Sequence, residues 1–412
     1  MQQTSRLSLK SLWRLYHTAQ ELLQGGRAED AAVHFTRLAG ARVRRPRGVE
    51  PLHWDDSNPL VARARLGLCY CYVEQGQLDQ ALAEVERVLA LEPTSAEALC
   101  ELAYILCLRG QRGAARRALE QAIEHNPESA RAHKALGFFF LQEDDVENAI
   151  SECRRAVQCD PSYDPAHVEL AVALGRAGKF DEAVRAMSRA LQIAPGRADY
   201  YYSLAALLRE TRRHEEAQGI LQGGLRIDPC NRDLLEAMAE VMLESGEPDK
   251  AIDYAQRLLR ECGKSLTARD VLGVAYLQQG RVNEALRMAD QMVAISPLDP
   301  SHHFKKAVLF QQQGMMREAL REFVRVADLA PDTEMGNEAR QAVDLIDNQQ
   351  MRAIVLVASE DPIFRTKLRR DPVMAAKERG FFLSEAGSSA LQMLDLDGLA
   401  AYSSGGNPVF FH

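Results

Sequence analysis

The chain has 412 residues, of which 46% are hydrophobic, and its formal net charge is −8 at pH 7. This acidic balance disfavours a nucleic acid as the main partner, because phosphate contacts need a concentrated positive surface. The eight cysteines include no Cys-x-x-Cys pair, so buried reduced thiols are expected in place of disulfides or a metal site. We find neither a secretory signal nor a membrane-spanning apolar run, which favours a cytoplasmic location and no membrane partner.

Residues 1–45 are expected to form an N-terminal cap that contains a degenerate helix pair. Ala19, Gly26 and Ala31 fall in the columns of the regular repeat that follows. Residues 46–61 interrupt the register of that repeat and contain three prolines, so we expect a loop there.

Residues 62–333 consist of eight copies of one 34-residue unit, without insertion or deletion. One column holds alanine in all eight copies, and the column twelve residues before it holds only small residues. Proline closes every copy except one. The alanine column is Ala81, Ala115, Ala149, Ala183, Ala217, Ala251, Ala285 and Ala319. An i, i+4 apolar stripe, a turn and a second amphipathic stretch predict two antiparallel helices in each unit. Such a pair cannot bury its apolar face alone, so the pairs must stack on their neighbours.

This period and the order of small, large and proline columns resemble the tetratricopeptide repeat family. The resemblance implies an all-α fold, an α-solenoid in which antiparallel helix pairs form a right-handed superhelix. A small C-terminal helical module is expected to follow it. Asp144 and Arg212 replace the usual turn glycine, and Lys306 stands where a leucine is usual, which predicts weaker packing in the last unit.

The resemblance also implies that the opening helix of each unit lines a concave groove. The predicted partner-binding residues are Leu66, Tyr70, Tyr104, Lys134, Phe138, Val168, Tyr202, Arg209, Glu236, Glu240 and Asp270. The first four units are largely apolar there, and Tyr70, Tyr104 and Phe138 share one column. An exposed apolar strip predicts a site for an extended or helical segment of a protein partner. Burial of the strip by tight superhelical curvature or by a segment of the chain is the alternative interpretation.

Acidic residues gather on the same face of two adjacent units. They are Asp233, Glu236, Glu240, Glu244 and Asp270. Like charges repel, so a solvated face or a cationic partner is expected there. Family members that clamp a C-terminal carboxylate use lysine, arginine and asparagine in these columns, so a carboxylate clamp is disfavoured.

The chain ends in three segments of different composition. Residues 334–350 are expected to form a polar helix that caps the last unit, 351–402 a separate small helical module, and 403–412 a flexible tail. Phe410 and Phe411 in this tail would be an aggregation liability if they were exposed, so they are predicted to dock into an apolar site. Self-association through the tail is one form that this docking can take.

Part of the C-terminal module resembles the nitrile-hydratase-like and Nif11-like leader peptides. The residues that carry the resemblance are Asp361-Pro362, Phe364-Arg365, Leu368, Asp371-Pro372, Ala375-Ala376, Gly380, Leu383-Ser384 and Leu391. Such leaders are recognised by modifying enzymes. An alternative function is therefore an accessory factor of peptide modification or secretion that recruits an enzyme through this module. A structural cap under the solenoid is the other interpretation of the same residues.

No catalytic motif, cofactor-binding loop or metal-ligand spacing is recognised in the chain. His133, His167 and His303 share one repeat column and are expected to fill space between units. We therefore predict a non-catalytic scaffold that binds a protein or peptide and needs neither a cofactor nor a metal.

Overall fold

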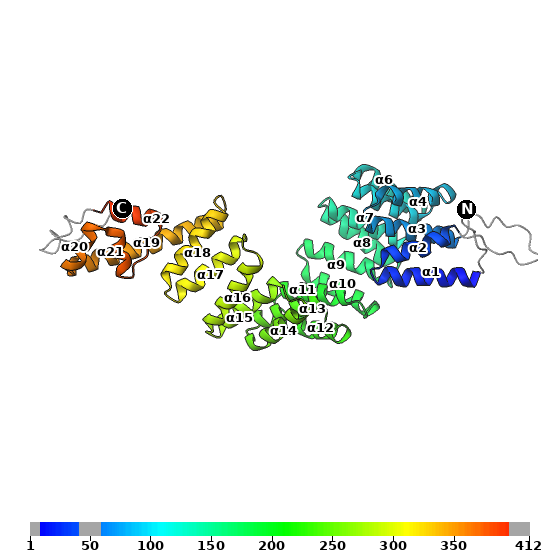
Figure 1. Ribbon diagram of the computed structural model, residues 1–412. Helices are drawn as coiled ribbons and strands as arrows, with labels where there is room; N and C mark the ends of the chain where they lie inside the picture. Colours follow the sequence, from blue (N-terminus) through cyan, green and yellow to red (C-terminus); the bar gives the residue numbers. More distant parts are fainter. Residues whose placement is uncertain (1–8, 41–58, 395–412) are drawn as a thin grey trace, which may run out of the picture. The chain divides into compact units, whose positions relative to one another are not determined.

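The computed structural model describes residues 9–40 and 59–394, which form helices α1–α22 and contain no strand (Figure 1). The predicted all-α solenoid of consecutive helix pairs is confirmed. The chain divides into two compact units, Met1–Arg212 and Arg213–His412. Within the described ranges, no helix is both long and apolar enough to cross a membrane.

The first compact unit consists of eleven described helices. They are α1 (Leu9–Gln24), α2 (Ala28–Ala39), α3 (Pro59–Glu74), α4 (Leu78–Leu91), α5 (Ala96–Leu108), α6 (Arg112–His125), α7 (Ala130–Gln142), α8 (Val146–Cys159), α9 (Asp164–Arg176), α10 (Phe180–Ile193) and α11 (Ala198–Glu210). The helix pair α1 and α2 packs on α3, and the ring of Phe35 lies in their shared core. A Cβ on Gly67 would lie 2.7 Å from that ring, so only glycine allows this approach.

The expected loop over residues 46–61 is wrong at its C-terminal end, because α3 already begins at Pro59. Proline is tolerated at the first position of a helix, since its missing N–H has no intrahelical acceptor there. The rest of that loop lies outside the described residues.

The alanine column is buried in all eight copies, with at most 1% of each side chain exposed. The small column is explained by the close approach of the two helices in each repeat, as Gly137 shows. A Cβ on Gly137 would lie 2.5 Å from Cys153 Sγ and 3.3 Å from the carbonyl oxygen of Ala149. Helices α7 and α8 therefore approach so closely that a methyl group has no room between them.

The second compact unit consists of the remaining helices. They are α12 (His214–Ile227), α13 (Arg232–Glu244), α14 (Pro248–Glu261), α15 (Leu266–Gln278), α16 (Val282–Ile295), α17 (Pro300–Gln312), α18 (Met316–Leu329), α19 (Glu334–Glu360), α20 (Pro362–Arg370), α21 (Pro372–Glu378) and α22 (Glu385–Gln392). Lys306 does not disturb the packing of α17 on α18, because its ammonium group lies 3.0 Å from Asp290 and 2.8 Å from Glu322.

The expected division between a capping helix and a separate module at residue 351 is wrong, because α19 runs without a break across it. The N-terminal half of α19 places Ala339 and Ile346 in a core with α17 and α18. Its C-terminal half places Ile354 and Ala358 in a core with α20–α22. No proline or glycine follows Gly336 until Pro362, so nothing in the sequence ends the helix earlier.

A buried carboxylate attaches α22 to α19. Asp347 accepts a hydrogen bond of 2.8 Å from the backbone N–H of Ser384 and another from the Ser384 hydroxyl. A Cβ on Gly387 would lie 2.5 Å from this carboxylate, so α22 approaches α19 closely. The C-terminal helices are thus fixed to the last solenoid helix by specific contacts.

The three column histidines are buried, and each bonds to the turn before its own helix. The Nε2 atoms of His133, His167 and His303 lie 2.9, 3.1 and 3.0 Å from the carbonyl oxygens of Pro127, Pro161 and Pro297. Nδ1 of His133 also lies 2.7 Å from the carboxylate of Glu152. Among the described residues, no group of three or more His, Cys, Asp or Glu side chains could hold a metal.

Candidate partner-binding groove

The opening helices of four successive 34-residue repeats form a groove of about 460 Å³ in the first compact unit. Helices α3, α5, α7 and α9 contact one another in this order. The lining includes Tyr70 and Glu74 from α3, Cys100, Glu101, Tyr104 and Cys107 from α5, Arg131, Lys134 and Phe138 from α7, Tyr163 before α9, and Glu169 from α9. The structure thus brings the three aromatic residues of the predicted strip, together with Lys134, into one concavity.

Two aromatic rings of this groove remain accessible. Tyr70 is 44% exposed and Tyr104 is 41% exposed, whereas Phe138 is half-buried. Curvature of the solenoid therefore leaves the rings of Tyr70 and Tyr104 accessible. Partly exposed rings in a concave surface can supply apolar contact area to a bound chain.

The charges of the groove are partly neutralised within it. Arg131 pairs with Glu97 at 2.8 Å and also with Glu101. Burial raises the pKa of the Glu169 carboxyl above its ordinary value, although the positive charge of Lys134 opposes this shift. The groove therefore presents the carboxylates of Glu74, Glu101 and Glu169 beside its aromatic rings, and Arg131 is already engaged by Glu101 and by Glu97, which lies outside the lining.

The thiols of the groove are suited to packing and not to nucleophilic chemistry. Burial raises the pKa of Cys100 to about 12, and burial also raises the pKa of Cys107. A thiol with a raised pKa carries little thiolate at neutral pH.

Leu66 does not line the groove, contrary to the prediction. Only 8% of its side chain is exposed, and it lies in a core with Cys69, Val85 and Ile105. Its position is buried because α4 and α5 both pack onto this part of α3. The other three predicted residues of the first compact unit, Val168, Tyr202 and Arg209, lie outside the lining of the groove.

The predicted acidic residues of the second compact unit lie on α13 and α15. Glu236, Glu240 and Asp270 are half-buried. Asp270 pairs with Lys305, and Glu244 lies 3.5 Å from a ring nitrogen of His214. Part of the expected repulsion is thus offset inside the chain, because the positive charge of Lys305 lies beside Asp270.

Sequence reasoning predicted Lys134 but missed the other charged residues of the groove, which are Glu74, Glu101, Arg131 and Glu169. Arg131 stands one full repeat after Glu97, in the same column and with the opposite charge. A search for opposite charges in the same column of adjacent units would have found this pair. Glu74 follows Tyr70 by four residues, so it shares the face of the ring on the same helix.

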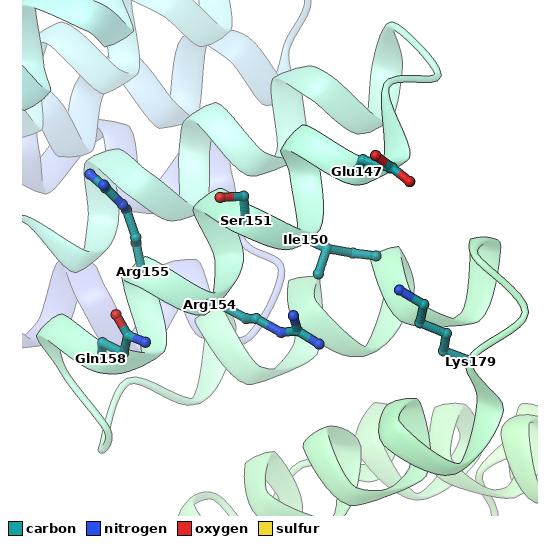
Figure 2. A pocket seen from close by; sticks show the side chains of 7 residues that line it. All are labelled: Glu147, Ile150, Ser151, Arg154, Arg155, Gln158 and Lys179. Carbon is teal, nitrogen blue, oxygen red and sulfur yellow. The ribbon is translucent and has the colours of Figure 1, made fainter.

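A second hollow in the first compact unit has a volume of about 500 Å³ and lies on the surface of α8. Figure 2 shows the side chains that line it. Arg154, Arg155 and Lys179 lie around it on exposed side chains, and Arg154 pairs with Glu182 at 2.8 Å. It has no aromatic lining, and its long exposed cations offer little geometric specificity. We therefore place the candidate site in the aromatic groove.

Family profiles described as Tetratricopeptide repeat match residues 16–96, 68–137, 140–208, 236–300 and 271–333. These ranges cover more than half of the chain, which therefore belongs to the tetratricopeptide repeat family. This family typically provides non-catalytic scaffolds for protein–protein interaction. The matched ranges end at residue 333, and the resemblance of residues 361–394 to leader peptides receives no support.

Several solved structures are similar to this chain. A chain of the APC/C hetero-tetramer Cut9–Hcn1 has 16% identity and a TM-score of 0.45, over 76% of this chain and 63% of that one. The match thus spans less than two thirds of the length of that chain. PilF of Pseudomonas aeruginosa has 20% identity and a TM-score of 0.43, over 51% of this chain and 95% of that one. YrrB, described as a TPR protein with an unusual peptide-binding site, has 20% identity and a TM-score of 0.37, over 46% of this chain and 97% of that one. No curated protein sequence matches this chain.

Proposed function

We propose that this chain is a non-catalytic scaffold whose groove on α3, α5, α7 and α9 holds an extended segment of a protein partner. The observation that carries the proposal is the exposure of Tyr70 and Tyr104 inside a concave surface. Aromatic side chains dominate the energy of many protein interfaces, above all where they are buried at the centre of the contact.

The exposed rings are worth a useful amount of binding energy. An aromatic side chain buries about 200 Å² when it is fully covered, so four-tenths of a tyrosine corresponds to about 80 Å². At about 25 cal/mol per Å², covering each ring contributes about 2 kcal/mol. Two such rings in one groove supply the centre of an interface, provided that one partner segment covers both.

The charges of the groove favour a partner segment that combines apolar side chains with a basic one. Glu74 is exposed and lies one helical turn from the ring of Tyr70. A lysine or arginine placed on that ring gains a cation–π contact and lies close to the carboxylate. Burial raises the pKa of Tyr70, and Glu74 raises it further, so the ring stays neutral at physiological pH.

Selection of binders from a displayed library of random peptides tests this proposal, because such a library makes no assumption about which protein the partner is. We expect the selected peptides to bind the wild-type chain and to lose roughly a hundredfold in affinity when Tyr104→Ala and Phe138→Ala are combined. Leu91→Ala is the matched control, because Leu91 is 43% exposed and lies outside the groove. Peptides that bind the double variant and the control equally well would contradict the proposal.

The accessory-factor hypothesis has no observation of this kind in its favour. Phe364, Leu368 and Leu391, which carry the resemblance to leader peptides, are buried in the core that α19 shares with α20–α22. A recognising enzyme could not reach these side chains in the folded chain. We therefore favour a structural role for residues 361–394.

A further inference from the structure

A second groove, of about 380 Å³, lies in the second compact unit and plays no part in the proposed function. Helix α18 forms one side of it, and α21, the segment before α22 and α22 itself form the other. Its lining residues include Leu320 and Val324 on α18, Val373 on α21, and Phe381 and Leu383 before α22. This groove therefore has an apolar floor.

Three basic residues lie around this floor. Arg317 stacks over the ring of Phe382 with its guanidinium carbon 4.9 Å from the centroid, and Arg321 and Lys377 also line the groove. Among residues 9–40 and 59–394, no carboxylate lies within ion-pair distance of these three side chains. This contrasts with Lys306 on the neighbouring helix, which pairs with two acids. Such a groove fits an occupant that carries both carboxylates and aliphatic side chains.

We propose that the groove binds the segment Asp395–Leu399 of the same chain. This segment reads Asp-Leu-Asp-Gly-Leu and lies outside the described residues, whose last member is Leu394. Its two aspartates match the unpaired cations, and its two leucines match the apolar floor. A partner protein is not needed to supply this chemistry, because the chain carries it beside the groove.

The position of the segment makes the contact geometrically accessible. Ser388 on α22 lines the groove, and Asp395 follows it by seven residues. Helical and extended chain together span at most roughly 16 Å over this stretch. A tether of this length gives an effective concentration of roughly millimolar, so even a weak contact is occupied. The contact would cover the apolar floor between the last repeat and the C-terminal helices.

A charge reversal in the full-length chain tests the proposal. In the variant with Asp395→Lys and Asp397→Lys, the segment is repelled by the groove, and a labelled synthetic peptide with the sequence of residues 393–402 is offered in its place. We expect fluorescence anisotropy to show binding to this variant at least about tenfold tighter than to the wild-type chain, whose own segment competes. Equal binding to both chains, or binding to neither, overturns the proposal.

Two further substitutions locate the contact. Adding Arg321→Glu to the variant should abolish peptide binding, and the milder Arg321→Gln should weaken it, whereas Arg325→Glu on the same helix should leave it unchanged. Arg325 is exposed but does not line the groove, so it is a matched control for net charge. An equal loss with Arg325→Glu would overturn the proposal, since it would mean that overall charge alone attracts the peptide. Circular dichroism checks that each variant is folded.

Two more outcomes distinguish this proposal from binding of a different occupant in the groove. Binding of a peptide with the sequence of residues 403–412, and not of residues 393–402, would assign the groove to Phe410 and Phe411 instead. Light scattering that shows dimers of the wild-type chain, lost in the charge-reversed variant, would transfer the contact to a second copy. Either result overturns docking of Asp395–Leu399 within one chain.

Discussion

The close approach of α7 and α8 predicts an unusual double-mutant result at Gly137 and Cys153. A methyl group at Gly137 would lie 2.5 Å from Cys153 Sγ, and Cys153 is fully buried, so the sulfur has no free space to enter. Overpacking of this kind costs about 1–3 kcal/mol, while the higher helix propensity of alanine returns about 1 kcal/mol. We expect Gly137→Ala to lower the free energy of unfolding by up to about 2 kcal/mol.

Removing the sulfur should abolish most of this effect. In a Cys153→Ala background the worst contact is gone, and only the contacts of 3.3 and 3.4 Å to backbone atoms of α8 remain. Gly137→Ala should then be nearly neutral, which makes the coupling between the two substitutions up to about 2 kcal/mol. Urea unfolding followed by circular dichroism measures the four chains of the cycle. Additive effects would refute the claim that the Cys153 sulfur is what excludes a methyl group at Gly137.

A control comes from a glycine with open space around it. Gly219 lies inside α12, and a Cβ built there meets no atom within 4 Å. Gly219→Ala should therefore raise the free energy of unfolding by about 0.5–1 kcal/mol. A loss of stability at both glycines would show that the helix propensity gain was overestimated.

Three other predictions concern a turn, a buried contact and an ion pair. Asp144 has a φ of 60°, so Asp144→Gly should raise the melting temperature, with a gain of about 1 kcal/mol. Asp347→Ala removes two buried hydrogen bonds and should cost about 1–3 kcal/mol. Relative to the wild-type chain, amide exchange should accelerate more in α22 than in α17. Burial opposes the shift, but hydrogen bonds from His303 and Lys306 lower the pKa of Glu322 below its ordinary value. The stability that this pair contributes is therefore present above the unfolded-state pKa of about 4.3 and is lost as the pH falls through the lower folded-state value. In the Glu322→Gln variant, the midpoint of urea unfolding should depend less on pH in that acidic range than it does in the wild-type chain. The same pH dependence in both chains would contradict the assignment.

The periodic part of the fold could be predicted because its constraints are local and repeat at a fixed spacing. A buried alanine that recurs every 34 residues places each second helix, and the small column places each first helix. The end of α19 was missed for a related reason. Helices stop at residues that cannot continue them, and a change of composition at Met351 is not such a signal, whereas Asp361-Pro362 is.

The groove was harder to predict because exposure depends on neighbours in the next units. Tyr70 and Leu66 both stand in columns expected to face the groove, yet only Tyr70 is exposed, since α4 and α5 cover Leu66. The engagement of Arg131 by two acids likewise depends on a distance across units, which a single helix does not reveal.

The bond from each column histidine to a proline carbonyl bears on how such a chain can change length. His133 and His167 each reach the carbonyl oxygen of the proline six residues earlier, which belongs to the preceding unit. Excision of residues 130–163 would bring His167 to the sixth position after Pro127, where His133 stands now. The junction would then regain the same bond between the same two atom types. Loss of this whole unit is thus compatible with an unchanged contact between neighbouring units, whereas deletion of a few residues between Pro127 and His133 would remove the six-residue spacing on which the bond depends.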